Sequence, residues 1–204
     1  MAIRKLDVEQ MLQTTPPSIP WLARGFIAKG CVTLLIGEAG TGKSLLALSL
    51  AQAVSSGSGI LDSPPAAQER SVVLDGENGE GELHRRIVGL GLKDVGVADV
   101  TGFSLSVNLS EVEEYLVKEG APGLLILDSA RRLWIEGDEN DSAEVSAMLM
   151  QVQQLARNFD IAIILIHHLN KGGVVRGSGA WKEVPEIVIE VGKWRKDKNE
   201  SRRY

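Results

Sequence analysis

Cysteine, aromatic residues and long apolar runs are scarce in this 204-residue chain. Cys31 is the single cysteine, and aromatic residues make up 4% of the sequence. A single cysteine excludes an internal disulfide, so we expect a reducing, cytoplasmic location. No apolar run approaches the length of a membrane span, and the segment Met1–Gln13 is too charged for a signal peptide. We therefore expect no membrane partner.

Positive charge is also in deficit. The chain has 22 Lys and Arg against 27 Asp and Glu, for a net charge of −5. This balance disfavours a broad, constitutive nucleic-acid surface, but it is compatible with a local basic loop. Charge alone therefore leaves DNA binding open.

The length permits one domain with a buried core that needs neither disulfides nor metals. We expect a single domain over 1–204, with 1–29 as an extended lead-in and 193–204 as a charged tail.

The most informative stretch is a glycine-rich loop that follows the apolar run Val32–Ile36. It matches G-x-x-x-x-G-K-[ST] at every constrained position, between a predicted strand and a predicted helix. Its glycines permit backbone N–H groups to turn toward phosphate oxygens, and the helix N-terminus adds partial positive charge. The pattern predicts a nucleotide-binding loop formed by Gly37, Glu38, Ala39, Gly40, Thr41, Gly42, Lys43 and Ser44. Lys43 would reach the β- and γ-phosphates of ATP, and the Ser44 hydroxyl would ligate Mg²⁺.

Two further apolar strands end close to a carboxylate. Ser71–Asp75 runs into Gly76 and Glu77, and Gly123–Asp128 ends on its own acid. Ligands of α/β sheets gather at the carboxyl ends of strands. Asp128 is therefore predicted to hold Mg²⁺ together with Ser44, and Glu77 is a candidate catalytic residue. The alternative for Glu77 is a simple helix N-terminal charge, since Glu80 and Glu82 follow it.

The apolar strand Ile161–Ile166 ends in two histidines. Consecutive strand residues point to opposite faces and no further ligand follows at metal spacing, so His167 and His168 do not predict a metal site. A polar side chain beside the γ-phosphate fits better. The glycine-rich segment Lys171–Trp181 comes next and is predicted to be a mobile loop.

Strand and helix signals alternate along the chain. This alternation predicts an α/β fold with a mostly parallel central sheet and helices on both faces. Beyond the segments above, we expect helices over 43–56, 79–90 and 142–158, a helix opened by the capping box Ser110–Glu113 and closed at Gly120, a weak strand near 100–103 and a last strand over 186–191.

Together these pieces resemble the RecA-like P-loop ATPase family over nearly the whole chain. Within it, Ile19-Pro20-Trp21-Leu22 and His167-His168 with Lys171 look most like the RepA-type replicative ATPases. The stretch Arg176-Gly177-Ser178-Gly179-Ala180 is similar to the Arg-x-Ser-Gly-Ala segment of DnaB-type helicases. The resemblance implies a RecA-like fold.

The resemblance also implies catalytic roles. Glu77 would activate the attacking water, and Asp128-Ser129 resembles the magnesium-site acid and serine of RecA. His168, or alternatively His167, would sense the γ-phosphate. Lys193 and Arg195 resemble a pair that such rings insert into a neighbour's nucleotide site. The alternative for that pair is a solvated tail.

The implied activity is Mg²⁺-dependent ATP hydrolysis coupled to single-stranded DNA in replication or recombination, by a chain that self-associates into a ring or filament. Two loops would contact DNA, 131–141 and 171–181, with Lys171 and Arg176 supplying charge. The first loop is acidic beyond Arg131 and Arg132, which suits DNA poorly.

Two other functions remain open. A KaiC-like regulatory ATPase would hydrolyse ATP without acting on DNA. A small P-loop kinase would need an acceptor pocket and a lid, and would have no use for Glu77 or Arg176–Ala180.

Overall fold

A computed structural model describes residues 5–59, 68–101, 105–134, 137–170, 173 and 175–192, with only the backbone of 105–108. The strands are β1 (Trp21–Ala23), β2 (Ile27–Ala28), β3 (Val32–Gly37), β4 (Ser71–Asp75), β5 (Val95–Asp99), β6 (Leu124–Asp128), β7 (Ala162–His168) and β8 (Ile187–Glu190). The helices are α1 (Val8–Leu12), α2 (Lys43–Ser56), α3 (Glu80–Leu90), α4 (Leu105–Glu119), α5 (Ala130–Leu133), α6 (Ser142–Asn158) and α7 (Ala180–Glu183).

A parallel sheet of six strands forms the centre, in the order β5-β4-β6-β7-β3-β8. The prediction of a mostly parallel α/β sheet is therefore confirmed. The four inner strands β4, β6, β7 and β3 are almost wholly buried because helices cover both faces of the sheet, whereas the edge strands β5 and β8 are partly exposed. The strand β7 lies between β6 and β3. His167 and His168, at the end of β7, therefore lie between the phosphate loop and Asp128.

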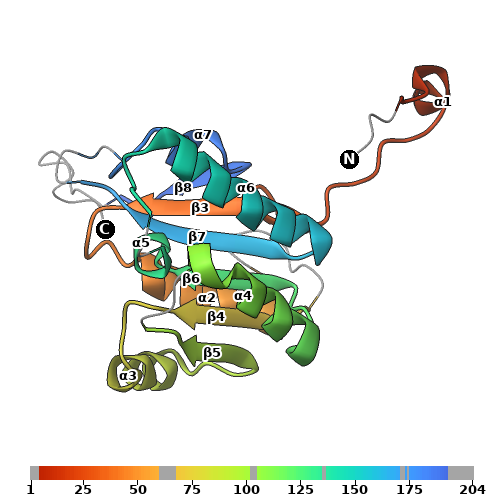
Figure 1. Ribbon diagram of the computed structural model, residues 1–204. Coiled ribbons are helices and arrows are strands. Elements are labelled where there is room, and N and C mark those ends of the chain that lie inside the picture. The colour runs from red at the N-terminus through yellow and green to blue at the C-terminus, as the bar shows by residue number, and fades with distance from the viewer. Residues whose placement is uncertain are drawn as a thin grey trace, which may run out of the picture.

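Two apolar clusters fill the space between sheet and helices. On one face, side chains of α4 and α6, such as Leu116 and Leu149, pack against the sheet residues Leu125 and Leu127. On the other face, α2 packs on residues such as Ile126. Figure 1 shows α4 and α6 in front of the sheet and α2 behind it.

The segment before the sheet has two parts. The short helix α1 lies away from the body of the domain (Figure 1), and its Leu12 is exposed. The strands β1 and β2 form an antiparallel pair whose Leu22 and Ile27 are buried in the second apolar cluster. Residues 21–28 are therefore part of the folded core and not only an extended lead-in.

Most predicted elements are present, with two corrections. The helix expected to open at the capping box Ser110–Glu113 begins earlier, at Leu105, so the box lies inside α4. The strand expected near 100–103 is β5, over Val95–Asp99. The helix α6 spans Ser142–Asn158 as predicted, capped by the Asp141 carboxylate on the N–H groups of Ala143 and Glu144. Among the described residues, no helix is both long and apolar enough to cross a membrane.

Candidate active site

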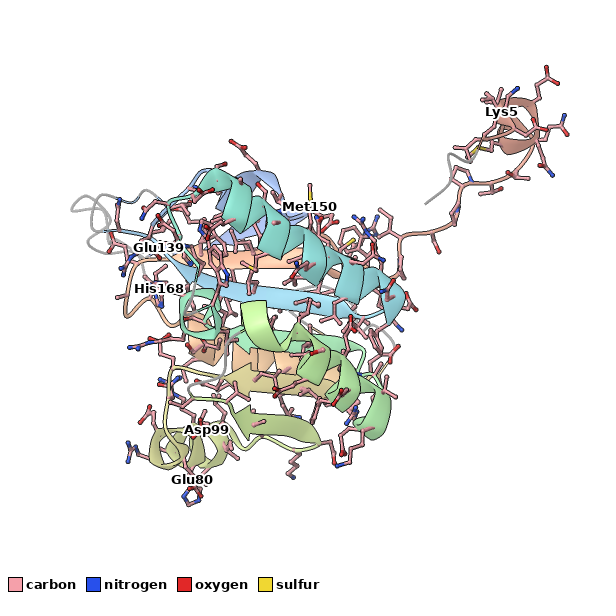
Figure 2. The ribbon with its side chains drawn as sticks, viewed as in Figure 1. Lys5, Glu80, Asp99, Glu139, Met150 and His168 are labelled. Atoms are coloured by element: carbon pink, nitrogen blue, oxygen red, sulfur yellow. The ribbon has the colours of Figure 1, made fainter. Side chains whose placement is uncertain are left out.

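The predicted site residues meet at one edge of the sheet. Gly37 at the end of β3 lies opposite His168 of β7, and Asp75 at the end of β4 lies opposite Asp128 of β6. Because all these strands are parallel, their carboxyl ends share this edge. In Figure 2, His168, Glu139 and Asp99 are labelled along the same side of the molecule.

The phosphate loop has the backbone that its glycines predict. Gly40 and Gly42 have φ angles of 73° and 86°, in the left-handed region that favours glycine. A Cβ atom on Gly37 would lie 2.5 Å from the carbonyl oxygen of Val191, so only glycine fits where β3 enters the loop. Gly42 then begins α2, whose N-terminal N–H groups can bind an anion.

Lys43 is held inside this loop. Its Nζ atom donates to the carbonyl oxygens of Gly37 and Glu38, both at 2.9 Å. Burial lowers the pKa of Lys43, and the nearby carboxylates of Asp128 and Glu77 act in the opposite direction. These carbonyl contacts place the ammonium group within the turn where phosphates would bind.

Ser44 and Asp128 fit a magnesium ion. The Ser44 hydroxyl hydrogen-bonds the Asp128 carboxylate, and the residue Asp128 is 2% exposed. Burial, followed by the like charges of Asp75 and Glu77, raises the pKa of Asp128 to about 6, although Ser44 opposes the rise. The Oδ1 atom of Asp128 is buried and has no hydrogen-bond partner in the described part of the chain. A hydroxyl beside a carboxylate oxygen that lacks a partner is a donor set suited to Mg²⁺.

Glu77 is positioned by a turn that Asp75 organises. The Oδ1 atom of Asp75 accepts the N–H groups of Glu77 and Asn78, both at 2.8 Å, and the Asn78 amide also donates to the Asp75 carboxylate. The turn passes close to α5, since a Cβ atom on Gly76 would lie 2.8 Å from the Leu133 side chain. This positioning of Glu77 by Asp75 was not predicted from the sequence, although a strand-end Asp before Gly76 and Asn78 is a turn signal.

Glu77 and His168 meet across the end of β6. The Nε2 atom of His168 lies 3.4 Å from Oε2 of Glu77. This contact lowers the pKa of Glu77, and burial offsets part of the effect. Glu77 is therefore ionised at neutral pH, as a group that accepts a proton from water must be.

The two histidines differ sharply in environment. His167 is fully buried, its ring is stacked on Trp181 with centroids 4.1 Å apart, and its Nε2 atom lies 2.8 Å from the carbonyl oxygen of Arg176. Burial lowers the pKa of His167 to about 4, so its ring is neutral and Nε2–H donates to that carbonyl. His168 instead faces the cleft beside Glu77.

This cleft has a volume of about 1020 Å³. It contains the candidate water-activating residue, the half-buried His168 and three arginines. The cleft is lined by Ala39, Gly76, Glu77, Thr101, Ser129, Arg131, Arg132, His168, Leu169, Asn170 and Arg176. The structure thus brings Arg176 of the second expected DNA loop close to the candidate catalytic residues. Lys171, Lys193 and Arg195 lie outside the described residues.

Glu139 is a second residue that the sequence analysis missed. Its side chain is 10% exposed, although it lies in the acidic part of the first expected DNA loop. Its Oε1 atom accepts from Nε of Arg176 at 2.8 Å, and its Oε2 atom lies 3.3 Å from Nε of Arg131. We call these two contacts the Glu139 bridge. Residue type alone does not single out Glu139 as the bridging residue, because its neighbours Asp138, Asn140 and Asp141 are equally polar.

Comparison with known proteins gives related sequences and a related structure. The chain is 24% identical over 169 residues to the DNA repair protein RadA of Aquifex aeolicus, covering 81% of this chain and 34% of that protein. It is 25% identical over 172 residues to the DNA repair and recombination protein RadB of Methanosphaera stadtmanae, covering 79% and 69%. The chain thus spans about a third of the length of this RadA relative.

Among solved structures, the crystal structure of a KaiC-like protein from Pyrococcus horikoshii matches with a TM-score of 0.65 and 17% identity. The match covers 90% of this chain and 85% of that one. At this identity the likeness shows the fold alone, and it confirms the predicted RecA-like α/β architecture.

The family model described as AAA domain (AAA_25) matches residues 2–174. The finer resemblance to RepA-type and DnaB-type helicases is not confirmed by these relatives and stays a prediction. Because the family model covers most of the sequence, the chain belongs to this AAA domain family, among the RecA-like P-loop ATPases.

Proposed function

We propose that this protein is a Mg²⁺-dependent ATPase that couples ATP hydrolysis to binding of, or movement along, single-stranded DNA. The observation that carries the proposal is the contact of 3.4 Å between Glu77 and His168, beside a phosphate loop and next to Arg176. This contact supports the proposal because it would connect Glu77, as the water-activating carboxylate, through His168 to the segment that carries Arg176.

Binding of ATP would use the phosphate loop and its helix. The amides of Gly37–Ser44 would surround the phosphates, and Lys43 would exchange its carbonyl contacts for the β- and γ-phosphates. Ser44 and Asp128 would hold the magnesium ion, which when bound neutralises charge on the phosphate oxygens.

Hydrolysis would use Glu77 as the group that orients and deprotonates the attacking water. His168 would respond to loss of the γ-phosphate because it contacts Glu77 directly. The response has a route to the loop, since the N–H of Arg176 donates to the carbonyl oxygen of His168 at 3.2 Å. Lys171 and Arg176 would then contact DNA phosphates.

The named relatives supply further support. The RadA relative is named a DNA repair protein and the RadB relative a DNA repair and recombination protein, which supports a role of this chain in DNA recombination or replication. Self-association into a ring or filament would bring Lys193 and Arg195 of one copy to the nucleotide of the next, where a cation would stabilise phosphoryl transfer.

A KaiC-like regulatory ATPase is the second candidate function. The net charge of −5 favours it, because a net negative charge disfavours a broad nucleic-acid surface. Such a protein would use the same ATP site, but nucleic acid would not change its rate of hydrolysis.

The test is steady-state ATP hydrolysis by the full chain with no DNA, with single-stranded DNA and with duplex DNA, beside the variant Glu77→Gln. We expect single strands to stimulate hydrolysis, and the variant to lose activity by on the order of 10²-fold or more. A rate that no nucleic acid changes would reject the DNA coupling in favour of the regulatory ATPase. Normal hydrolysis by Glu77→Gln would reject our assignment of the water-activating residue.

A further inference from the structure

The Glu139 bridge joins the two segments that were expected to contact DNA. Arg131 belongs to α5 in the first segment, and Arg176 belongs to the second. Both arginines line the cleft beside Glu77, and their side chains are 39% and 57% exposed. The carboxylate between them is the buried member of the group, and its single negative charge faces two positive charges.

The backbone of Glu139 is fixed independently of its carboxylate. Its carbonyl oxygen accepts the N–H of Ser178 at 2.7 Å. Gly177 passes so close that a Cβ atom there would lie 2.2 Å from the same oxygen, with a φ of +88°. The two segments therefore stay packed together through main-chain contacts when the side-chain charge is altered.

A guanidinium group binds carboxylates and phosphates through the same charge-assisted geometry. Two arginines that converge on one carboxylate are therefore also arranged to bind one phosphate. The contact with Arg131 is the weaker half of the bridge, since Oε2 of Glu139 is buried yet lacks a hydrogen bond within the described residues. A phosphate with more acceptor oxygens can satisfy both arginines better than this carboxylate does.

We propose that Arg131 and Arg176 form a binding site for a backbone phosphate of single-stranded DNA, and that Glu139 occupies this site until DNA displaces it. The inference rests on the proposed function and deepens it. It explains why an acidic loop lies beside the DNA-binding segment: its central carboxylate faces inward, against the arginines. Release of Glu139 frees Arg176, whose backbone is bonded to His167 and His168 at the end of β7.

The test measures binding of a fluorescent oligothymidylate by the full chain with Mg²⁺ and a non-hydrolysable ATP analogue. We expect Glu139→Gln to bind about 5- to 10-fold more tightly than the wild type, because the competing charge is gone. The matched control is Glu144→Gln, which removes an exposed carboxylate near the same turn. We expect the control to change affinity less than 2-fold.

A double-mutant cycle separates this site from a general charge effect. In an Arg176→Gln background, Glu139→Gln is expected to give no gain in affinity for the oligonucleotide. Weaker or unchanged binding by folded Glu139→Gln, an equal gain from Glu144→Gln, or a full gain without Arg176 would each overturn the proposal. If Glu139→Gln does not fold, Glu139→Asp replaces it, with an expected gain of 2- to 3-fold because the shorter side chain retracts from Arg176.

Failure of the proposed function gives a different result. If neither the wild type nor Glu139→Gln binds the oligonucleotide, both the DNA coupling and the phosphate site are rejected. If the wild type binds the oligonucleotide and folded Glu139→Gln shows no gain in affinity, the site occupied by Glu139 is rejected while the DNA coupling stands. Trypsin cleavage after Arg176, followed by mass spectrometry, should be several-fold faster in Glu139→Gln than in Glu144→Gln, and equal rates would count against displacement.

Discussion

Single residues behind the candidate catalytic groups determine where those groups lie. Glu77 does not project from a helix or a strand. It sits on a turn whose hydrogen bonds converge on Asp75, a residue 2% exposed at the end of β4.

Replacing Asp75 should impair catalysis more than nucleotide binding. Asp75→Ala removes the acceptor for the N–H groups of Glu77 and Asn78, so Glu77 loses its position while the phosphate loop stays intact. We expect kcat for ATP hydrolysis to fall about 10- to 100-fold, with nucleotide Kd changed less than 3-fold. Asp99→Ala is the matched control, because Asp99 lies opposite Asp75 in β5 and caps an exposed turn at Thr101. A rise in Kd equal to the fall in kcat would contradict a positioning role.

His167 should make stability depend on pH. Its pKa is about 4 in the folded protein against an ordinary value of 6.5, so the unfolded chain binds the proton more readily. The contribution of neutral His167 to the free energy of unfolding should therefore be complete above pH 6.5. The free energy of unfolding should fall by up to about 3 kcal/mol as pH drops toward 4.

Urea denaturation at pH 7.5, 6 and 5 would measure this loss. The variant His167→Gln keeps a donor for the Arg176 carbonyl but does not titrate, so its stability should fall less over the same range. Parallel pH profiles for the two proteins would show that His167 does not carry the effect.

At the scale of elements, the packing of the segment with Arg176 against the segment with Glu139 depends on the point where Gly177 passes the Glu139 backbone. Gly177→Ala places a Cβ atom 2.2 Å from the Glu139 carbonyl oxygen on a backbone with φ of +88°. We expect a loss of about 1 to 3 kcal/mol in the free energy of unfolding, measured by urea denaturation.

Gly89→Ala in α3 is the opposite case and serves as the control. Nothing lies within 4 Å of a Cβ atom at Gly89, and its backbone is helical, so we expect a gain of up to about 1 kcal/mol. Equal effects of the two substitutions would mean that the crossing tolerates a side chain.

At the scale of the whole molecule, both apolar clusters share one sheet. Leu125 and Ile126 are neighbours in β6, both fully buried, and they face opposite clusters. Either substitution by alanine should lower the free energy of unfolding by about 2 to 5 kcal/mol. Because the sheet connects the clusters, urea denaturation should remain a single transition in both variants. Val88→Ala, at an exposed position, should cost less than about 0.5 kcal/mol. A second transition in either core variant would mean that the two faces unfold separately.

The sequence by itself determined the local features of this protein. The phosphate loop, the helix Ser142–Asn158 with its Asp141 cap and the strands that end in Asp75 and Asp128 are encoded by neighbouring residues. Glycine positions, apolar periodicity and capping side chains act within a few residues, so they can be read along the chain. The early start of α4 was missed because a capping box is only a local signal, and here Ser110–Glu113 lies inside the helix.

Only the tertiary structure decided which polar side chains meet. The sequence could not separate His167 from His168 with certainty, because strand register and the position of Trp181 determine which ring is buried. It also could not single out Glu139, whose partners come from α5 and from a segment 37 residues further along. Burial and ion pairing arise from contacts between segments distant in sequence, and these exist only once the strand order brings their ends together.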